Sequence, residues 1–238
     1  MNLTREEIKE GATLLLDKPY GWTSFGLITQ IKRWTKSKIG HAGTLDPLAS
    51  GLMICCTGKF TKKLTGFIGL PKEYTGIITI GHTTDTYDLE SFPQNNIPIS
   101  HVSNKLIFDT AQKFTGEIEQ FPPIHSAIKK EGTPVYKLAR KGEPVEMKSR
   151  KSIIAVFEIT KINLPDIYFK VSCSSGTYIR SLANDFGKEL GTGAYLKSLR
   201  RTKIGDFKIE DALSIEELSN EFGALMNVRI IQPKIEIQ

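Results

Sequence analysis

The amino-acid sequence predicts an α+β fold: a mixed, mainly antiparallel sheet with flanking helices. Short apolar runs bounded by turn residues, such as 12–16 and 51–57, are typical of buried strands. Residues 167–173 alternate between apolar and polar side chains, which indicates a strand with one buried face. Between Phe25 and Trp34 an apolar residue recurs at every third position, which favours a helix with one apolar face.

The size and charge of the chain bound its class. Its 238 residues, 39% of them hydrophobic and 24% charged, can bury a sizeable core as one large domain or two small ones. We predict a single domain over 1–238. The 32 lysines and arginines exceed the 26 aspartates and glutamates, giving a formal net charge of +6. This balance suits a polyanionic partner, although mild basicity often has no functional meaning.

Several classes of protein are excluded by what the sequence lacks. No apolar run approaches the roughly 18 residues of a membrane-spanning helix, and residues 1–7 carry acids where a signal peptide would be apolar. Cys55, Cys56 and Cys173 are odd in number, lie in apolar runs and form no Cys-x-x-Cys pair. Such free thiols suit a reducing compartment, so a cytoplasmic protein is predicted. His82 and Asp85 have no second cluster with metal spacing, so no metal site is predicted.

Turn and cap residues divide the chain into its elements. Glycine and proline mark the breaks, and Thr23 or Ser24 can begin the first helix. The predicted elements are a strand at 12–16, a turn at 19–22, a helix to about 34, a strand at 51–57, a basic helix start at 59–63, a strand at 74–80, a loop at 92–100, a helix at 103–114, strands at 150–161 and 167–174, a helix ending at 190, a helix at 215–226 and a strand at 230–233.

The helix predicted at 103–114 has its own apolar pattern. Ser103 can cap it, and Gly116 follows its end. Leu106, Phe108, Ala111 and Phe114 are expected to face largely inward.

The stretch 41–51, His-Ala-Gly-Thr-Leu-Asp-Pro-Leu-Ala-Ser-Gly, centres on the carboxylate of Asp46. Gly43 and Gly51 permit backbone angles and close approaches that other residues forbid. Pro47 fixes its own φ and restricts Asp46 before it. We therefore expect Asp46 on a stiff, irregular loop beside the buried strand 51–57, as active-site carboxylates are often mounted. The alternative is that Asp46 only begins a turn, since Asp-Pro pairs commonly do.

The string 43–51 resembles the signature loop of the TruB family of tRNA pseudouridine synthases. Further segments resemble the motifs of this family in the same order, from about Leu14 to Leu213: 16–24, 74–80, 120–129 with 132–140, 174–180 and 196–205. The resemblance implies the pseudouridine synthase catalytic fold. It also implies isomerisation of uridine to pseudouridine at position 55 in the T-arm loop of tRNA, after the base is flipped out. No cofactor is implied, because the reaction transfers no group and has no redox step.

The resemblance assigns four catalytic residues. Asp46 would be the nucleophile, acting at the sugar C1′, through a glycal, or at C6 of the base. Tyr74 matches a tyrosine that stacks beside the base, Arg180 matches an arginine that pairs with the aspartate, and Tyr178 matches a second active-site tyrosine. The alternatives are a half-buried strand-end aromatic for Tyr74 and an exposed helix-start arginine for Arg180.

The resemblance also implies residues that bind the substrate. His41 would help hold the displaced loop of the RNA, and Leu199 would line the base pocket. Lys18 matches a lysine of the family that is either structural or near the phosphate backbone. Arg200 and Arg201 are expected to touch RNA.

Residues 125–151 contain eight lysines and arginines and three glutamates, a net charge of +5. A mobile basic segment can bind phosphates whatever the RNA sequence. The resemblance makes this segment an RNA-binding insertion, and a short basic helix is expected around 136–141. Its candidate contacts are Lys129, Lys137, Arg140 and Lys141. The alternative is a solvated surface helix.

The resemblance bounds the other partners. Many family members continue into a PUA domain, and no separate one is expected within 1–238. A monomer that binds the tRNA T stem-loop, with no obligate protein partner, is the default. Two other functions remain open: a non-catalytic RNA-binding or tRNA-folding protein that uses the same groove, and a hydrolase in which His41 serves Asp46 as base.

Overall fold

The structure is a computed structural model and describes residues 4–123, 129–130, 133–134 and 148–223. The chain divides into two compact units, each of which we describe by itself. The first unit comprises Met1–Tyr74 and Leu199–Gln238, and the second comprises Thr75–Ser198. Within the described residues, no helix is long and apolar enough to cross a membrane.

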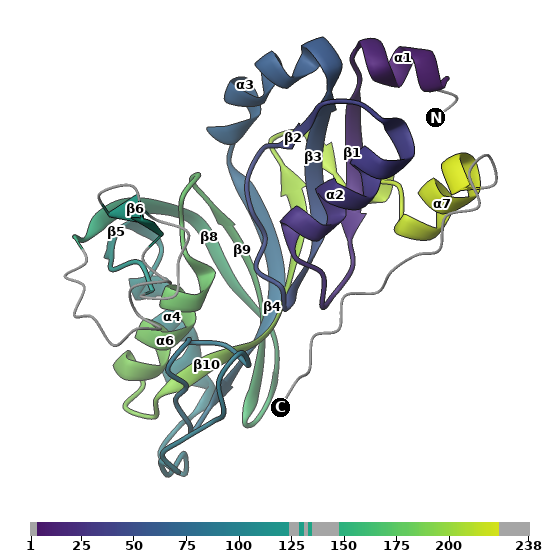
Figure 1. Cartoon of the computed structure of the whole chain (residues 1–238). Helices are drawn as coiled ribbons and strands as arrows, with labels where there is room; N and C mark the ends of the chain where they lie inside the picture. Colours follow the sequence, from purple (N-terminus) through teal and green to yellow (C-terminus); the bar gives the residue numbers. More distant parts are fainter. Residues whose placement is uncertain (1–3, 124–128, 131–132, 135–147, 224–238) are drawn as a thin grey trace. The chain divides into compact units, whose positions relative to one another are not determined.

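The first unit holds a small sheet with short helices (Figure 1). Its elements are α1 (Arg5–Glu10), β1 (Thr13–Lys18), α2 (Ser24–Thr35), β2 (Ile39–His41), β3 (Ala49–Thr57), η1 (Gly58–Lys63), α3 (Leu64–Ile68), the last part of β10 (Ala194–Ile204), β11 (Phe207–Lys208), η2 (Ile209–Asp211) and α7 (Ile215–Gly223). Strand β3 is antiparallel to β1 and β2 and parallel to β10, and β11 is antiparallel to β10.

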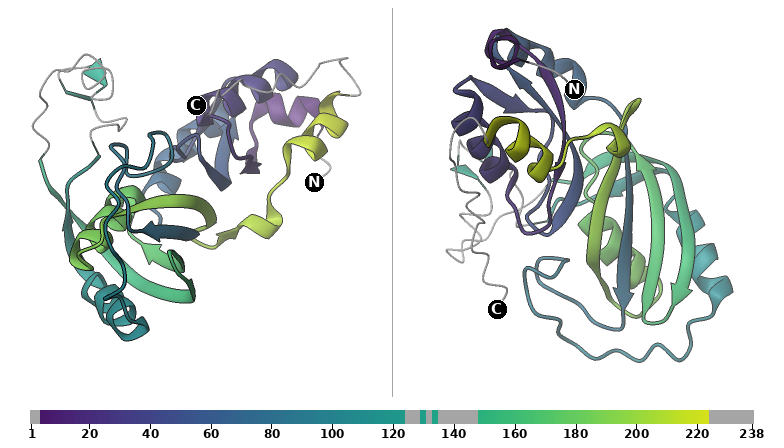
Figure 2. Two further views of the ribbon diagram at one scale, coloured as in Figure 1. Left: turned by 90° about the horizontal axis from the view of Figure 1, so that it is seen from below. Right: turned by 90° about the vertical axis from the view of Figure 1, so that its right-hand side faces the viewer.

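The second unit holds the longer strands. Its elements are most of β4 (Lys72–Ile80), α4 (Asn104–Lys113), β5 (Gly116–Gln120), β6 (Lys129–Lys130), β7 (Thr133–Pro134), β8 (Arg150–Asn163), β9 (Asp166–Cys173), α6 (Ile179–Glu189) and the first part of β10. The strand order is β10-β4-β9-β8-β5, with β8 antiparallel to β9 and to β5. The right-hand view of Figure 2 shows these strands side by side, with α4 and α6 on one face. The mixed, mainly antiparallel sheet with flanking helices is as predicted.

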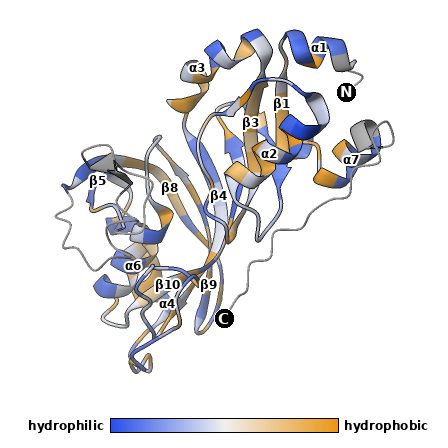
Figure 3. Ribbon diagram, viewed as in Figure 1, coloured by the Kyte–Doolittle hydropathy of each residue, from blue (hydrophilic) through white to orange (hydrophobic). Residues whose placement is uncertain are grey.

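Apolar strands form the core of the first unit. Every side chain from Leu52 to Cys56 in β3 is buried, while β1 buries alternate residues such as Leu14 and Leu16. Figure 3 shows this apolar colouring along β1 and β3. The predicted strands 12–16 and 51–57 are confirmed. A loop attached to β3 is therefore anchored in the core.

The alternation in β9 is confirmed in the second unit. Ile167, Phe169, Val171 and Cys173 are all at most 2% exposed, as the period of two predicts. The ring of Phe169 packs edge-on against Phe157 of β8, with 5.9 Å between ring centroids. These contacts make the β8–β9 pair the centre of the core of this unit.

Two helices bury faces that only partly coincide with the predicted ones. Helix α2 begins after Thr23, whose hydroxyl accepts a hydrogen bond from the N–H of Gly26, and it buries Leu27, Ile31 and Trp34. Phe25, predicted to face inward, is 77% exposed.

Helix α4 differs in the same way. It buries Ile107, Thr110 and Ala111, whereas Phe108, predicted to face inward, is 47% exposed. The predicted basic helix at 136–141, the end of the last predicted helix and the strand at 230–233 lie outside the described residues.

Candidate active site

Asp46 lies half-buried on the irregular loop between β2 and β3, as predicted. Its carbonyl accepts a hydrogen bond from the N–H of Ala49 at 3.1 Å. The residue before it, Leu45, is fixed by Ser24, whose hydroxyl accepts from the Leu45 N–H (2.9 Å) and donates to its carbonyl (2.8 Å). The residue after it, Pro47, accepts from the N–H of Gly21 at 2.9 Å. Both neighbours are thus held, so the carboxylate is positioned by the fold.

Lys18, at the end of β1, is fully buried and holds the same loop. Its ammonium donates to the carbonyls of Trp22 (2.5 Å), Pro19 (3.0 Å) and Pro47 (3.3 Å). Burial lowers the pKa of Lys18 to about 8, although the carboxylate of Asp46 acts in the opposite direction. These contacts favour a role in holding the loop, and direct contact between Lys18 and RNA stays a prediction.

Arg201 of β10 is a second buried cation at the loop. It is 1% exposed, and its guanidinium donates from Nε to the carbonyl of Leu52 (2.7 Å) and from Nη2 to that of Gly43 (3.2 Å). Gly51 is paired with it across the strands and has a φ of +107°. A Cβ at Gly51 would lie 2.3 Å from the carbonyl oxygen of Arg201, so only glycine fits there. This geometry makes Arg201 a residue that positions the loop.

His41, in β2, begins the loop and is half-buried. Burial lowers the pKa of His41, and the nearby guanidinium of Arg201 acts in the same direction. The neutral imidazole is therefore favoured near pH 7. A neutral ring suits a residue that packs against bases better than one that binds a phosphate.

Leu199 and Arg200 lie beside the loop on β10. Leu199 is half-buried and is paired in register with Ala49 of β3. The guanidinium of Arg200 makes a two-point ion pair with Asp17, at 3.1 and 2.6 Å. This pair was not predicted, and it fixes Arg200 at the rim of the site. Tyr74, at the start of β4, is buried.

Arg180 of the second unit is buried in a polar cluster, 4% exposed. Its Nε lies 3.6 Å from the carboxylate of Asp88, and its Nη1 donates to the carbonyl of Thr86 at 3.1 Å. The Thr86 hydroxyl in turn donates to Asp88 at 2.6 Å. The alternative of an exposed arginine is therefore wrong. The predicted pairing of Arg180 with Asp46 joins residues of the two units and stays a prediction.

Asp88 was missed as a candidate in the sequence. The only signal was the polar string at 81–88, which gives no indication that its last carboxylate meets Arg180. Its carboxylate also accepts from the N–H of Glu90 at 3.0 Å, so it is well supported. A buried, hydrogen-bonded carboxylate of this kind orients the guanidinium beside it.

Tyr178 precedes α6 and is half-buried. The side-chain amide of Gln120 accepts from the N–H of Tyr178 (3.2 Å) and donates to its carbonyl (3.3 Å). The guanidinium of Arg150 lies 5.4 Å from the centre of the Tyr178 ring, a cation–π contact. The ring is thus fixed at the start of the helix that carries Arg180.

The basic insertion is largely beyond what the structure describes. Lys137, Arg140 and Lys141 lie outside the described residues, and Lys129 is described only as part of β6. Among the described residues, no group of three or more His, Cys, Asp or Glu side chains could hold a metal ion.

The buried state of Lys18 predicts a pH dependence of stability. Between pH 8 and 10.5 the unfolded chain keeps a proton on Lys18 that the folded protein has lost. Because the unfolded state then binds more protons, the free energy of unfolding should rise with pH in this window. Lys18→Met has no ionisable group at this position. The unfolding free energy of the wild type minus that of Lys18→Met should therefore grow by up to about 3 kcal/mol as the pH rises from 8 to 10.5.

Urea denaturation of both proteins at several pH values from 7.5 to 10.5 measures that difference. Lys9→Met, a change at an exposed lysine in α1, is the matched control and should give a curve parallel to the wild type. A Lys18→Met curve that is also parallel to the wild type would show that Lys18 is fully charged in the folded protein.

Family models match nearly the whole chain. Residues 31–179 match the N-terminal domain of "TruB family pseudouridylate synthase", and residues 180–227 match the "tRNA pseudouridylate synthase B C-terminal domain". A Flavobacterium johnsoniae protein named tRNA pseudouridine synthase B is 52% identical over 90% of this chain and 96% of its own length. A Phocaeicola vulgatus protein of the same name is 47% identical over 87% of this chain and 92% of its own length.

Solved structures support the fold. A chain in a crystal structure of a Cbf5-Nop10-Gar1 complex is 29% identical, with a TM-score of 0.73 over 95% of this chain. A chain in an H/ACA RNP bound to a substrate RNA containing 2'-deoxyuridine is 27% identical, with a TM-score of 0.69 over 93% of this chain. The matches span 60% and 57% of those two chains.

Proposed function

The chain belongs to the TruB family of pseudouridine synthases, and we propose that it converts uridine to pseudouridine at position 55, in the T-arm loop of tRNA. The relatives that carry the name tRNA pseudouridine synthase B support tRNA as the substrate class. The single observation that carries the proposal is the fixed loop at Asp46. The residues on either side of Asp46 are hydrogen-bonded to the fold. Two buried cations, Lys18 and Arg201, also donate to backbone carbonyls of the loop.

The reaction rearranges one nucleotide. The bond from the ribose C1′ to N1 of uracil breaks, and C1′ then joins C5 of the same ring. C5 gives up its hydrogen and N1 gains one, so the reaction is an isomerisation that needs no group from outside. The target base must first leave the stack in the RNA loop, at a cost of roughly a few kcal/mol.

Asp46 is the nucleophile in this proposal, attacking the sugar at C1′ or adding to C6 of the base, and elimination through a glycal is the alternative route at the sugar. A nucleophile gains most when it is held in its reactive position before the substrate arrives. The hydrogen bonds to Leu45 and Pro47 on either side of Asp46 supply that rigidity. Lys18 and Arg201 add to it by donating hydrogen bonds to the backbone carbonyls of Pro47 and Gly43.

The other catalytic residues act on the base and on the aspartate. Tyr74 stacks beside the flipped uracil, and Leu199 lines the pocket that receives it. Arg180 pairs with Asp46, oriented by its own contact with Asp88. Tyr178 joins this cluster from the residue before α6.

The substrate RNA is bound both at the edge of the site and by the insertion. His41 helps hold the displaced loop of the RNA. Arg200, held by Asp17, contacts the RNA at the rim. Residues 125–151, including Lys129, form the RNA-binding insertion and contact phosphates.

We further propose that the protein acts as a monomer in the cytoplasm and that residues 1–238 work as one catalytic domain. The relatives named tRNA pseudouridine synthase B support an enzyme that modifies tRNA after it has been transcribed. Sedimentation of the free protein tests the monomer, and an equilibrium dimer at micromolar concentration would contradict it.

The insertion gives a prediction about salt. Phosphate contacts release counterions, so affinity for RNA falls with salt. Replacing Lys137, Arg140 and Lys141 with glutamine should weaken binding and, if two phosphate contacts are lost, lower the log–log salt slope by roughly 1.4 to 1.8. Dissociation constants for a T-arm stem-loop at several salt concentrations measure this slope.

The control for this experiment is a matched set of exposed lysines in the first unit, Lys59, Lys62 and Lys63, replaced in the same way. The control should keep the wild-type slope. If the insertion variant keeps both slope and affinity, residues 125–151 are a solvated surface.

A tritium-release assay tests the proposed activity. A T-arm stem-loop is made with tritium at C5 of its uridines, and pseudouridine formation releases that tritium to water. The wild-type protein should release the tritium of one uridine per RNA. The same RNA with cytidine at position 55 should release none, and equal release from both would contradict the proposed position.

A further inference from the structure

Two aromatic side chains of the first unit lie on its surface. Phe25 is 77% exposed, more than any other large hydrophobic side chain among the described residues, and Tyr20 is 50% exposed. Single exposed apolar side chains are common on protein surfaces, so the meaning of these two depends on what lies beside them.

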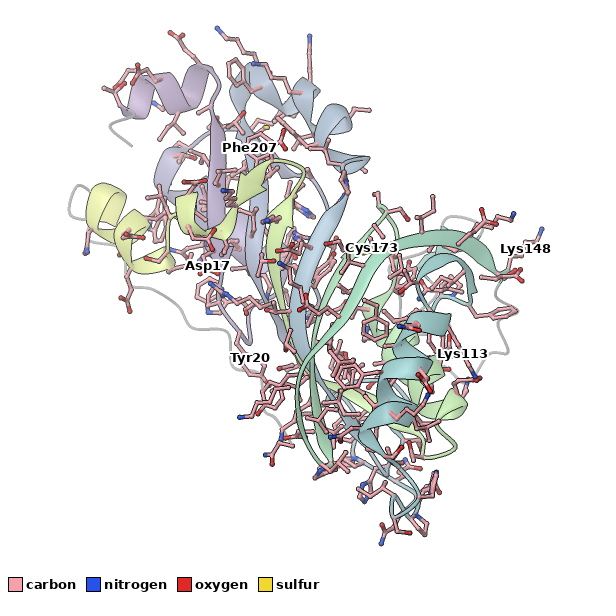
Figure 4. All side chains as sticks on the ribbon, turned by 180° about the vertical axis from the view of Figure 1, so that it is seen from behind. Asp17, Tyr20, Lys113, Lys148, Cys173 and Phe207 are labelled. Atoms are coloured by element: carbon pink, nitrogen blue, oxygen red, sulfur yellow. The ribbon has the colours of Figure 1, made fainter. Side chains whose placement is uncertain are left out.

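Tyr20 is held by the framework of the catalytic loop. It lies in the turn after β1, and Figure 4 labels it beyond Asp17, the second-last residue of that strand. Its neighbour Gly21 donates to the carbonyl of Pro47 at 2.9 Å, and the ammonium of Lys18 donates to the same carbonyl at 3.3 Å. The turn that carries Tyr20 is therefore bonded to the residue after the nucleophile.

Phe25 is held from the other side of the nucleophile. It follows Ser24, whose hydroxyl makes both hydrogen bonds to the backbone of Leu45. Leu45 is the residue before Asp46. The two exposed aromatics are thus each one residue away from a group that fixes a neighbour of Asp46.

Exposed residues near Phe25 in the sequence are polar or basic. Thr23 is exposed beside Phe25, and Lys32 is exposed two turns further along the same helix. An aromatic ring among such residues suits a nucleic acid, whose bases have apolar faces and whose phosphates attract lysine. An interface with a second protein would be expected to have a core depleted of charged residues.

We propose that Tyr20 and Phe25 form a stacking surface for unpaired bases of the substrate RNA that neighbour the flipped uridine. The inference rests on the proposed function. Flipping one nucleotide unstacks its neighbours, and aromatic side chains are the usual partners of unstacked RNA bases. Because the backbone beside each ring is hydrogen-bonded to a neighbour of Asp46, bases stacked on the rings would hold the target nucleotide near the catalytic loop.

Three variants at Phe25 separate stacking from simple burial. Phe25→Ala removes the ring, Phe25→Leu keeps an apolar side chain, and Phe25→Trp keeps an aromatic one. With a T-arm stem-loop as probe, Phe25→Ala should weaken binding by roughly fivefold or more, as expected for one lost base stack. Tryptophan should restore affinity and leucine should not. Tyr20→Ala should have an effect of the same direction.

A fluorescent base reports the stacking directly. With 2-aminopurine placed beside the target uridine, binding to the wild type should quench it by stacking, and binding to Phe25→Ala should leave it bright. Phe108→Ala, at an exposed phenylalanine of α4, is the matched control and should behave as the wild type. The melting temperatures of all variants should agree, since none of these rings is in the core.

Each outcome decides the inference. If Phe25→Ala and Tyr20→Ala bind RNA as tightly as the wild type, with full quenching, it is overturned. If they instead dissociate a wild-type oligomer in sedimentation while binding RNA normally, the surface is a protein interface and the inference is also overturned. Pseudouridine formation by the wild type is measured in the same samples, so a failure of the proposed function is seen separately from a failure of stacking.

Discussion

Replacing Asp46 with asparagine is expected to lower the rate of pseudouridine formation by roughly a thousandfold or more while RNA affinity stays within a few fold. An amide has nearly the shape of a carboxylate but is a poor nucleophile. The loop should keep its conformation, because Leu45, Pro47 and Gly43 are each held by hydrogen bonds to their own backbone groups. Single-turnover rates and dissociation constants on a tRNA transcript measure the two effects.

Two further variants sharpen this experiment. Asparagine can hydrolyse back to aspartate, so Asp46→Ala is measured beside it. Asp85→Asn, at an exposed aspartate of the second unit, is the matched control and should keep wild-type activity. Turnover by freshly prepared Asp46→Ala above the rate without enzyme would rule out Asp46 as the nucleophile.

Replacing Arg180 with methionine should remove both activity and stability. The change leaves the carboxylate of Asp88 buried without the guanidinium that lies 3.6 Å from it. Breaking a buried ion pair in this way costs about 3–5 kcal/mol of unfolding free energy. Activity should fall too, because Arg180 is the proposed partner of Asp46.

The double variant Asp88→Asn with Arg180→Met separates the two losses. It removes both buried charges, so most of the unfolding free energy should return while activity does not. Urea denaturation and single-turnover rates are measured on the wild type, both single variants and the double variant. Full activity in Arg180→Met, or a double variant no more stable than Arg180→Met, would contradict this account.

The fold class could be predicted because strand patterns are local. A period of two in 167–173 and an apolar run at 51–57 predict buried strands with no knowledge of their partners. Strand β10 could not be found this way, since its sequence is rich in lysine and arginine. Arg201, polar in the sequence, is buried there because its guanidinium bonds to backbone carbonyls.

Helix α2 shows where a pattern misleads. Phe25 and Trp34 are nine residues apart in the sequence, which is about two and a half turns of helix, so they point to opposite sides. A recurrence at every third residue drifts around the helix. The face that is buried follows Leu27, Ile31 and Trp34, at the true helical spacing.

The site was predictable only in part. Glycine and proline around Asp46 predict a stiff loop from local sequence alone. The groups that hold it could not be predicted, since Arg201 reaches Gly43 from 158 residues away and Lys18 reaches Pro47 from 29 residues away. Such contacts depend on which strands pair, and local patterns do not encode that pairing.

Mapping pseudouridine in an unmodified tRNA transcript tests the central claim most directly. The transcript is incubated with the wild-type protein, cut into fragments and analysed by mass spectrometry after a reagent that labels pseudouridine. We predict one pseudouridine per tRNA, at position 55 of the T-arm loop, and none with Asp46→Ala. A transcript that stays unmodified, or one modified only at other positions, would contradict the account.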